Sequence, residues 1–492
     1  MTEQNARKWS ILAAVTLVSF ITNVDATIVV VGLPKLMQGL HITVVTGLWT
    51  ITSYIITSTV FLLPAGRWSD VIGTKRIFMI GLVIFTISTA LCGFANTGTM
   101  LVIYRFIQGT GAALALATAT PIIVRAFPQK ELGRALGINS TSWVIGSIVG
   151  PVVGGALITS FGWRSIFFVT VPFGIIGLIA SAIVLKNTSA AVKAKTDWLG
   201  IITFASGLVA LLLALSEGQA WGWSSAAILG LFAAAVVLLA AFVAVEMRVK
   251  QSLFDLKLLL HGHFSAGLGI TMSYSIGYFA TTFLLTLYLQ GALHLNALDA
   301  GLLLIPLSAP QLIMGPLGGT LADRIGPARL VLAGVFLLGI GGLLLGFVGP
   351  RLSILAIVVP QLIMSAANGL AWPSLTKAVL SSAPREQAGS ASGMFFTFRN
   401  VGMALSMTLA LVIAELSVPP AVASQAFLGT AGVLSAHIQG ALVHSTDVGF
   451  RSFVLFYLVA LLLGLFLLRP HRAKQASVES QSSSVESQSS SM

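Results

Sequence analysis

Residues 66–76 read Gly66-Arg-Trp-Ser-Asp70-Val-Ile-Gly73-Thr-Lys-Arg76, and residues 319–329 read Gly319-Thr-Leu-Ala-Asp323-Arg-Ile-Gly326-Pro-Ala-Arg329. Both stretches have the spacing Gly-x3-Asp-x2-Gly-x2-Arg, and they follow the second and the tenth long apolar segments of the chain. Each would join the second and third helices of a six-helix set. Two six-helix halves repeated in the same sense are a plan found in membrane transporters, which hold their substrate between the halves.

The composition indicates an integral membrane protein. Hydrophobic residues make up 56% of the 492 residues and charged residues only 9%, whereas about 25% of the residues of a soluble domain are charged. One span takes roughly 20 apolar residues, so the length suits about 14 spans with short connections. We therefore predict an all-α membrane bundle of 14 helices, arranged as six, two and six.

The predicted halves have definite boundaries. Residues 1–185 form the first half, 186–262 an inserted pair of helices with its flanking loops, and 263–472 the second half. The stretch Ala426–Val443 is apolar enough for a fifteenth span, but an odd number of spans would place the basic residues near the C-terminus outside. We therefore predict an outer hairpin or helix near 416–448, a last span from Phe450 to Leu468, and a disordered Ser-rich tail over 473–492.

The basic residues report orientation rather than a nucleic-acid partner. The net charge is +12, yet only Lys35, Arg164, Arg351 and Arg451 fall in the loops predicted to lie outside, and Arg105 and Arg399 fall within spans. All other lysines and arginines lie on the opposite side. This bias predicts a multi-pass protein with both termini in the cytoplasm.

Asp25 is the first candidate for chemistry, because it alone among the 15 acidic residues lies well inside a predicted span. A carboxylate at such a depth costs about 2.5–3.5 kcal/mol on insertion scales, so it marks a functional site by default. A carboxylate removed from water gains from taking up a proton. The alternative is a structural polar contact between helices.

Arg105 is the predicted partner of Asp25. Both residues lie about 10–12 Å inside the outer face at 1.5 Å per residue. Arg105, Gln108, Gly109 and Ala112 share one face of the fourth span, which we expect to look into a cavity. A salt bridge with no role in coupling is the alternative.

Two groups of residues are candidates for a conformational switch. In the fifth span, Gly146, Gly150 and Gly154 form a smooth strip for close helix packing, with Gly155 beside it, and Pro151 removes a backbone hydrogen bond. We expect this strip at a gate between the halves. The repeated stretches are predicted to be charged loops, in which glycines permit turns and acids bind a basic group or a helix N-terminus. Their candidate residues are Gly66, Asp70, Gly73, Arg76 and Asp323.

Aromatic and amide side chains within spans are candidates for substrate contact, although such residues more often serve packing or the interfacial belt. Arg399 is a second cation within a span, and it either contacts substrate or stabilises the half. With Asp25, the candidates are Trp49, Tyr54, Gln108, Trp143, Tyr274, Tyr278, Gln311, Gln361, Asn368, Trp372, Arg399 and Asn400.

Several motifs together resemble one family. They run in order along the chain: Val24-Asp25-Ala-Thr-Ile-Val-Val-Val-Gly-Leu-Pro34, Gly66–Arg76, Arg105-Phe-Ile-Gln108-Gly109-Thr-Gly111, Gly146–Gly155 and Trp163-Arg164-Ser-Ile-Phe-Phe-Val-Thr-Val-Pro172. The chain resembles the fourteen-span drug:proton antiporters (EmrB/QacA-like) of the major facilitator superfamily.

The resemblance implies proton-driven export of lipophilic, in particular cationic, drugs from a bacterial inner membrane by alternating access. By it, Asp25 recognises a proton or a cationic drug, Arg105 couples the proton, and Gly146–Gly155 form the gate. Apart from the proton as coupling ion, no cofactor or metal is expected. The expected partners are small lipophilic molecules and membrane lipids, for a monomer that binds no nucleic acid. Whether a periplasmic adaptor protein attaches stays open.

Other functions remain open from the residues alone. A dedicated exporter of one metabolite, antibiotic or lipid, or an uptake system, would use the same scaffold. A membrane enzyme is disfavoured, because the seven histidines are scattered and no Gly-x4-Gly-Lys-Ser/Thr loop occurs. A channel is disfavoured by the lack of charge rings.

Overall fold

The structure is a computed structural model, which describes residues 2–186, 197–249, 256–293, 295, 297–349, 353–419, 422 and 435–468. In this part of the chain every regular element is helical. Thirteen helices are long and apolar enough to cross a membrane, and a bent pair makes a fourteenth crossing. The predicted all-α bundle of fourteen spans is confirmed.

The first half comprises six crossings, of which the second is bent. Its helices are α1 (Thr2–Leu40), α2 (Val44–Val60) with α3 (Leu62–Ile72), α4 (Thr74–Gly93), α5 (Gly98–Ala126), α6 (Gln129–Phe161) and α7 (Ser165–Phe168) with α8 (Thr170–Val184). The side chains of Thr43 and Thr97 accept hydrogen bonds from backbone amides in the first turns of α2 and α5, which is the usual way to satisfy a helix start.

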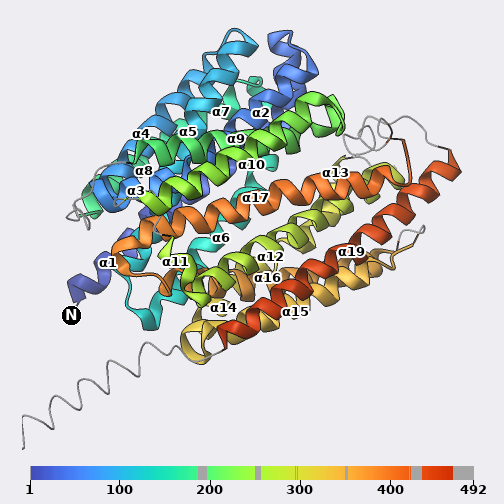
Figure 1. The fold of residues 1–492 in the computed structure, drawn as a ribbon. Helices are drawn as coiled ribbons and strands as arrows, with labels where there is room; N and C mark the ends of the chain where they lie inside the picture. The colour runs from blue at the N-terminus through green and yellow to red at the C-terminus, as the bar shows by residue number, and fades with distance from the viewer. Residues whose placement is uncertain are drawn as a thin grey trace, which may run out of the picture.

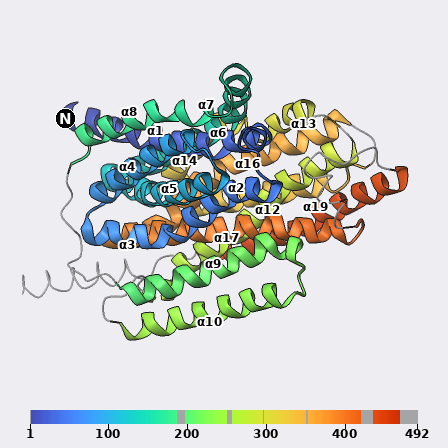
Figure 2. The same cartoon turned by 90° about the horizontal axis from the view of Figure 1, so that it is seen from above.

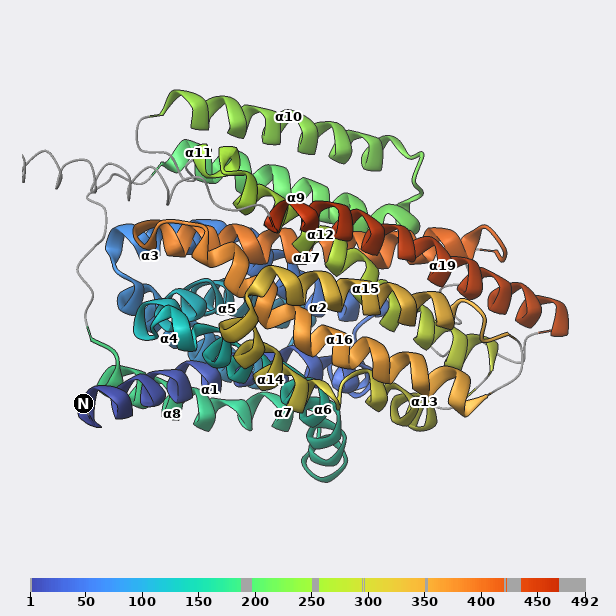
Figure 3. The same cartoon turned by 90° about the horizontal axis from the view of Figure 1, so that it is seen from below.

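The inserted pair consists of α9 (Trp198–Trp221) and α10 (Ala226–Arg248). Asp197 and Ser225 cap their N-termini. In both turned views α10 lies at the outer edge of the molecule, with α9 between it and the bundle (Figures 2 and 3). Helix α9 contacts α2 of the first half and α17 of the second half.

The second half repeats the plan of the first half. Its elements are α11 (Lys257–Leu260), α12 (Gly262–Thr286) with the π-helix η1 (Leu287–Ala292), α13 (Ala297–Leu304), the 3₁₀ turn η2 (Ile305–Leu307), α14 (Gln311–Ile325), α15 (Pro327–Leu345), α16 (Ile354–Ser381), the 3₁₀ turn η3 (Arg385–Gln387), α17 (Ala388–Glu415) and α19 (Ala436–Leu467).

The last helix starts earlier than predicted. The sequence placed its start at Phe450, but α19 begins at Ala436 and runs without a break to Leu467. The Ser435 side chain accepts a hydrogen bond from the amide of Ile438 (3.4 Å) and caps the helix there. The part of the predicted outer hairpin or helix from Ala436 onward therefore belongs to α19. Most of the rest of the hairpin predicted near 416–448, at 420–421 and 423–434, lies outside the described residues, as does the tail 473–492.

The two repeated stretches are not loops. Gly66 to Ile72 belong to α3, Gly73 is the single residue between helices, and α4 begins at Thr74. In the second copy, Gly326 separates α14 from α15 in the same way. Gly73 and Gly326 have φ values of 111° and 92°, a region of backbone space that favours glycine. Each stretch is therefore a sharp reversal between two helices.

The halves lie side by side, with the first half in blue to teal and the second in yellow to red (Figure 1). They meet chiefly where α6 packs on α14 and where α3 packs on α17. Glycines permit this close packing, since a Cβ on Gly137 would clash with the backbone of Gly315 and a Cβ on Gly66 would clash with that of Gly389. Both contacts lie toward the face of the bundle at which α1 begins, called the N-terminal face below.

Candidate functional site

Asp25 and Arg105 form an ion pair inside the first half. Arg105 Nη1 donates to Asp25 Oδ2 at 2.7 Å. Arg105 is 1% exposed and Asp25 is 0% exposed, so the pair is fully enclosed by protein. The pairing that was predicted from their similar depth in α1 and α5 is confirmed. A role in proton coupling remains a prediction.

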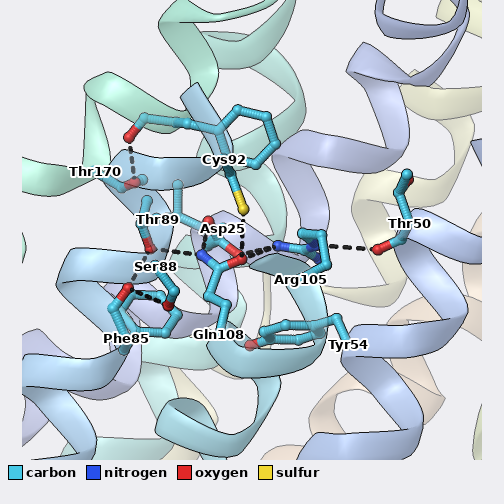
Figure 4. A network of polar contacts seen from close by, with 12 residues as sticks. Asp25, Thr50, Tyr54, Phe85, Ser88, Thr89, Cys92, Arg105, Gln108 and Thr170 are labelled. Carbon is cyan, nitrogen blue, oxygen red and sulfur yellow. Dashed lines mark hydrogen bonds and ion pairs between the residues drawn. The ribbon is translucent and has the colours of Figure 1, made fainter. Parts of the chain in front are cut away.

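Gln108 completes the surroundings of the carboxylate. Its Nε2 donates to Asp25 Oδ1 (2.9 Å) and to Thr89 Oγ1 (2.6 Å), and its Oε1 accepts from Arg105 Nη1 (2.6 Å). Figure 4 shows the side chain of Asp25 from α1 meeting those of Arg105 and Gln108 from α5. Both oxygens of Asp25 are thus bonded, one to a cation and one to an amide.

Arg105 is also held from the side of α2. Its Nε donates to the backbone carbonyl of Thr50 (3.0 Å), and its guanidinium carbon lies 4.2 Å from the centre of the Tyr54 ring. A Cβ on Gly109 would clash with Thr57 and Tyr54, so this glycine lets α5 approach α2. The buried network therefore joins α1, α2, α4 and α5 (Figure 4).

One prediction about this region differs from the structure. The face of α5 that carries Arg105, Gln108, Gly109 and Ala112 is buried against neighbouring helices, and its polar groups bond to α1, α2 and α4 instead of facing a cavity. The ring of Tyr54 is 6% exposed and lies against the Arg105 guanidinium, so a role in substrate contact stays a prediction.

The ion pair of Asp25 and Arg105 ties α1 to α5 only while both groups are charged. A buried carboxylate that keeps its charge needs its partners, and a neutral carboxylic acid does not. Protonation of Asp25 would remove the ion pair and leave Arg105 with Thr50, Gln108 and Tyr54 only. Helix α1 would then lose its ion pair with α5.

A second polar group lies within the second half, where the sequence predicted pocket residues. The Tyr274 hydroxyl donates to Asn368 Oδ1, Asn368 Nδ2 donates to Gln311 Oε1 at 2.8 Å, and Gln311 Nε2 donates to the Tyr278 hydroxyl at 2.7 Å. The structure thus brings four candidates together from α12, α14 and α16. Gln361 lies apart, with its Nε2 bonded to the Leu303 carbonyl (2.8 Å).

A third group surrounds Arg399 of α17. Its guanidinium carbon lies 5.0 Å from the ring centre of Trp143, 5.1 Å from that of Phe279 and 5.6 Å from that of Trp372. We call these four residues the Arg399 cluster. Phe279 was not predicted, because nothing in the sequence distinguishes it from the 27 other phenylalanines. Trp49 is half-buried on α2 and contacts no other aromatic ring among the described residues.

Asn400, the neighbour of Arg399, connects the halves. Its Oδ1 accepts from Arg399 Nη1 (3.0 Å), and its Nδ2 donates to Thr59 Oγ1 of α2 (3.1 Å). Trp143 of the Arg399 cluster also comes from the first half, and it stacks on Phe396 with ring centres 6.4 Å apart. The cluster therefore lies where both halves meet.

Each copy of the repeated stretch places a carboxylate on backbone amides of a helix in the opposite half. Asp70 accepts from the amides of Gly389 (3.0 Å) and Ser390 (2.8 Å) in the first turn of α17. Asp323 accepts from the amides of Gly133 (2.8 Å) and Arg134 (2.9 Å) near the start of α6. Helix N-termini carry unpaired amides and a partial positive charge, so the Asp70 carboxylate is favourable at the first turn of α17.

A basic side chain lies beside each of the two carboxylates, and neither of these basic residues was among the predicted switch residues. Arg125 lies 3.5 Å from Asp70, and Lys377 lies 2.5 Å from Asp323. Arg76 was predicted to belong to the switch, and its side chain is exposed on α4. Arg125 and Lys377 come from α5 and α16, and the spacing of the motif gives no signal of either.

The glycine strip of α6 packs within the first half and not between the halves. A Cβ on Gly150 would clash with Thr27, and one on Gly154 would meet Ile28 at 2.5 Å, both in α1. Gly146 faces Asn23 of the same helix, whereas a Cβ on Gly155 meets nothing within 4 Å. In this structure the strip does not lie between the halves, and its role in a gate stays a prediction. Helix α6 continues through Pro151. The close contact between halves comes from an earlier part of α6.

Comparison with known proteins identifies relatives over most of the chain. The chain is 30% identical over 408 residues to the multidrug transporter protein MdtP of Bacillus subtilis, covering 82% of this chain and 75% of that protein. It is 31% identical over 399 residues to the multidrug resistance protein Stp of Mycobacterium tuberculosis (81% and 74%). It is 28% identical over 414 residues to the tetracenomycin C resistance and export protein of Streptomyces glaucescens (81% and 74%).

Solved structures share the fold. The human organic anion transporter MFSD10 has a TM-score of 0.63 at 15% identity, covering 93% of this chain and 99% of that chain. FucP in the outward conformation has a TM-score of 0.61 at 14% identity, with the same coverage. The sequence family described as the Major Facilitator Superfamily matches residues 15–407. Together with the repeated halves and fourteen crossings, this match shows that the chain is a multi-pass membrane transporter of the major facilitator superfamily.

Proposed function

We propose that the protein exports lipophilic compounds from a bacterial cell in exchange for protons, by alternating access. Export of drugs is supported by the relatives named as multidrug transporters and as an antibiotic resistance and export protein. The observation that carries proton coupling is the fully buried Asp25, whose two oxygens are bonded to Arg105 and Gln108.

The proposed orientation follows from the basic residues. With most lysines and arginines on the N-terminal face, that face is the cytoplasmic one and the protein is a monomer of the inner membrane with both termini inside. The contacts of Asp70 and Asp323 then hold the cytoplasmic ends of the halves together. The protein in this state is closed toward the cytoplasm, and the contacts must break before it can load substrate from that side.

Proton binding at Asp25 would provide the coupling step. A hydrogen bond to a charged group contributes about 1.5–3 kcal/mol, so loss of the Arg105 contact shifts a two-state equilibrium about tenfold or more. The membrane potential adds about 2.3 kcal/mol per charge for each 100 mV. One proton per cycle can therefore drive export against a gradient.

The test uses everted membrane vesicles with an acidic lumen. A panel of unrelated lipophilic compounds of both charges is added, and proton release from the lumen is measured with a pH-sensitive dye. Asp25→Asn is expected to abolish compound-induced proton release. Glu217→Gln changes an acid on α9 that is outside the network, and it is expected to behave as wild type. Unchanged proton release in Asp25→Asn would reject the coupling role.

A further inference from the structure

Arg399 is a partly buried cation within a membrane helix, and it has no carboxylate partner among the described residues. It lies 11 positions into α17, about 16 Å from the N-terminal end of that helix at 1.5 Å per residue, and is therefore near the middle of the membrane. The described residues form four ion pairs, and Arg399 is in none of them. Arg105, the other arginine deep in a span, is by contrast neutralised by Asp25.

An arginine at this depth is costly unless something compensates its charge. Insertion scales give about 2.5–3.5 kcal/mol for such a residue. Three ring faces within 5.6 Å supply part of the compensation, at about 0.5–2 kcal/mol each. The guanidinium has five N–H donors, and among the described residues its side chain donates a hydrogen bond to Asn400.

The chemistry of the Arg399 cluster fits a flat anion. Guanidinium binds a carboxylate through two parallel hydrogen bonds, which are about twice as strong as neutral ones. The rings of Trp143 and Trp372 come from opposite halves and offer flat apolar surfaces, and both rings are partly exposed. An aromatic ligand bound here would touch both halves at once.

Among the described residues, a lipophilic cation finds no equivalent partner within the membrane helices. Asp25 is the carboxylate that lies deep in a described span, and both of its oxygens are already bonded inside the first half. The cation predicted from the family resemblance would have to displace Arg105 to reach it. Arg399, by contrast, would repel a cation at the place where the halves meet.

We propose that Arg399, with the rings of Trp143, Phe279 and Trp372, binds the anionic group of planar aromatic acids, and that these acids are the substrate class of the protein. This inference rests on the proposed function, since it names what is exported. The carboxylate, or an equivalent enolate or phenolate, pairs with the guanidinium, and the aromatic body lies against the tryptophans.

The test compares two ligands of the same shape and opposite charge, 2-naphthoate and 2-naphthylmethylammonium, on purified full-length protein in detergent at pH 7. Without any gradient, the affinity is measured by isothermal calorimetry. Wild type is expected to bind 2-naphthoate at least tenfold more tightly than the ammonium compound. Equal affinities, or tighter binding of the ammonium compound, would overturn the proposal without any variant.

Variants then locate the site. Arg399→Gln is expected to weaken 2-naphthoate binding at least tenfold, and Arg399→Lys to weaken it less, because lysine keeps the charge but not the paired donors. Arg451→Gln is the matched control, since Arg451 is exposed and its guanidinium carbon lies 5.4 Å from the ring centre of Phe347 on the far side of the second half. Binding within twofold of wild type in Arg399→Gln would contradict the proposal.

The same ligands separate this inference from the proposed function. In everted vesicles, 2-naphthoate is expected to release lumenal protons in wild type and to lose this effect in Asp25→Asn, while its affinity for the purified variant is retained. Binding that depends on Arg399, without any gradient-driven transport, would support the anion site and reject the proposed antiport. Proton release by cationic compounds alone would support the antiport and reject the anion site.

Discussion

Asp70 and Ser390, 320 positions apart in the chain, are joined by two hydrogen bonds of 2.8 Å, one from the backbone amide and one from the hydroxyl of Ser390. The contact fastens the end of α3 to the start of α17, and hence one half to the other. Asp323 makes the related contact from α14 to α6. The two repeated stretches thus each supply one contact between the halves, and both contacts lie on the N-terminal face. We call them the Asp70 clamp and the Asp323 clamp.

Neutralising either clamp is expected to open the N-terminal face. Asp70→Asn and Asp323→Asn each remove a charged acceptor from two helix amides, at about 1.5–3 kcal/mol, which shifts the population of open molecules about tenfold or more. Spin labels at Ile72 and Ser381, both exposed at this face, report the distance between halves by electron resonance. Cys92 is buried and stays unlabelled.

The double variant should widen the distance distribution further than either single variant, because the clamps are separate contacts on the same interface. Arg76→Gln provides the control, since this exposed arginine belongs to the motif but lies outside the clamp. A distribution in Asp70→Asn that matches the wild type would show that the clamp does not hold the halves.

Arg105→Lys is expected to lower transport at least tenfold although it keeps the charge. Arginine uses separate nitrogens to reach Thr50 and Asp25, and a single ammonium cannot span both partners with the same geometry. Transport is measured as proton release from everted vesicles at equal protein levels. Activity equal to wild type would indicate that charge alone is needed at this position.

Substitutions of Tyr54 test whether its aromatic ring helps to hold Arg105. Tyr54→Phe keeps the aromatic face 4.2 Å from the guanidinium and is expected to retain transport. Tyr54→Leu removes a cation–π contact that contributes up to about 2 kcal/mol when desolvated, and transport should fall several-fold. If the two variants behave alike, the ring face contributes nothing measurable.

The glycines of α6 provide a packing prediction with an internal control. Gly150→Ala places a methyl group against Thr27 in a tight helix contact, and such overpacking costs about 1–3 kcal/mol. Its melting temperature, followed by tryptophan fluorescence in detergent, should fall by several degrees. Gly155→Ala lies five positions away in open space and should leave the melting temperature unchanged.

Much of the architecture could be predicted, since it follows from local properties of the sequence. Long apolar segments fix the number of spans, and helix rise is regular enough that equal depth predicted the contact of Asp25 with Arg105. The charge bias predicted an orientation by the same kind of local count. These inferences need no knowledge of which helix lies next to which.

The failures come from the missing knowledge of neighbours. A glycine strip shows that some helix approaches closely, but not that Gly150 faces α1 while Gly137 faces α14. The Arg399 cluster draws its rings from three other helices, and no spacing in the sequence connects them. The continuation of α3 to Ile72 was missed because its charged residues suggested a loop, whereas they lie at the end of a membrane helix.

The α9–α10 hairpin can be inserted between two six-helix halves without changing how they are oriented in the membrane. Because it leaves and returns on one side of the bilayer, its addition preserves the sense in which all later helices are threaded. The contact of α3 with α17 and the contact of α14 with α6 therefore lie at the same surface. A single extra helix would have turned the entire second half upside down and separated them by the thickness of the membrane.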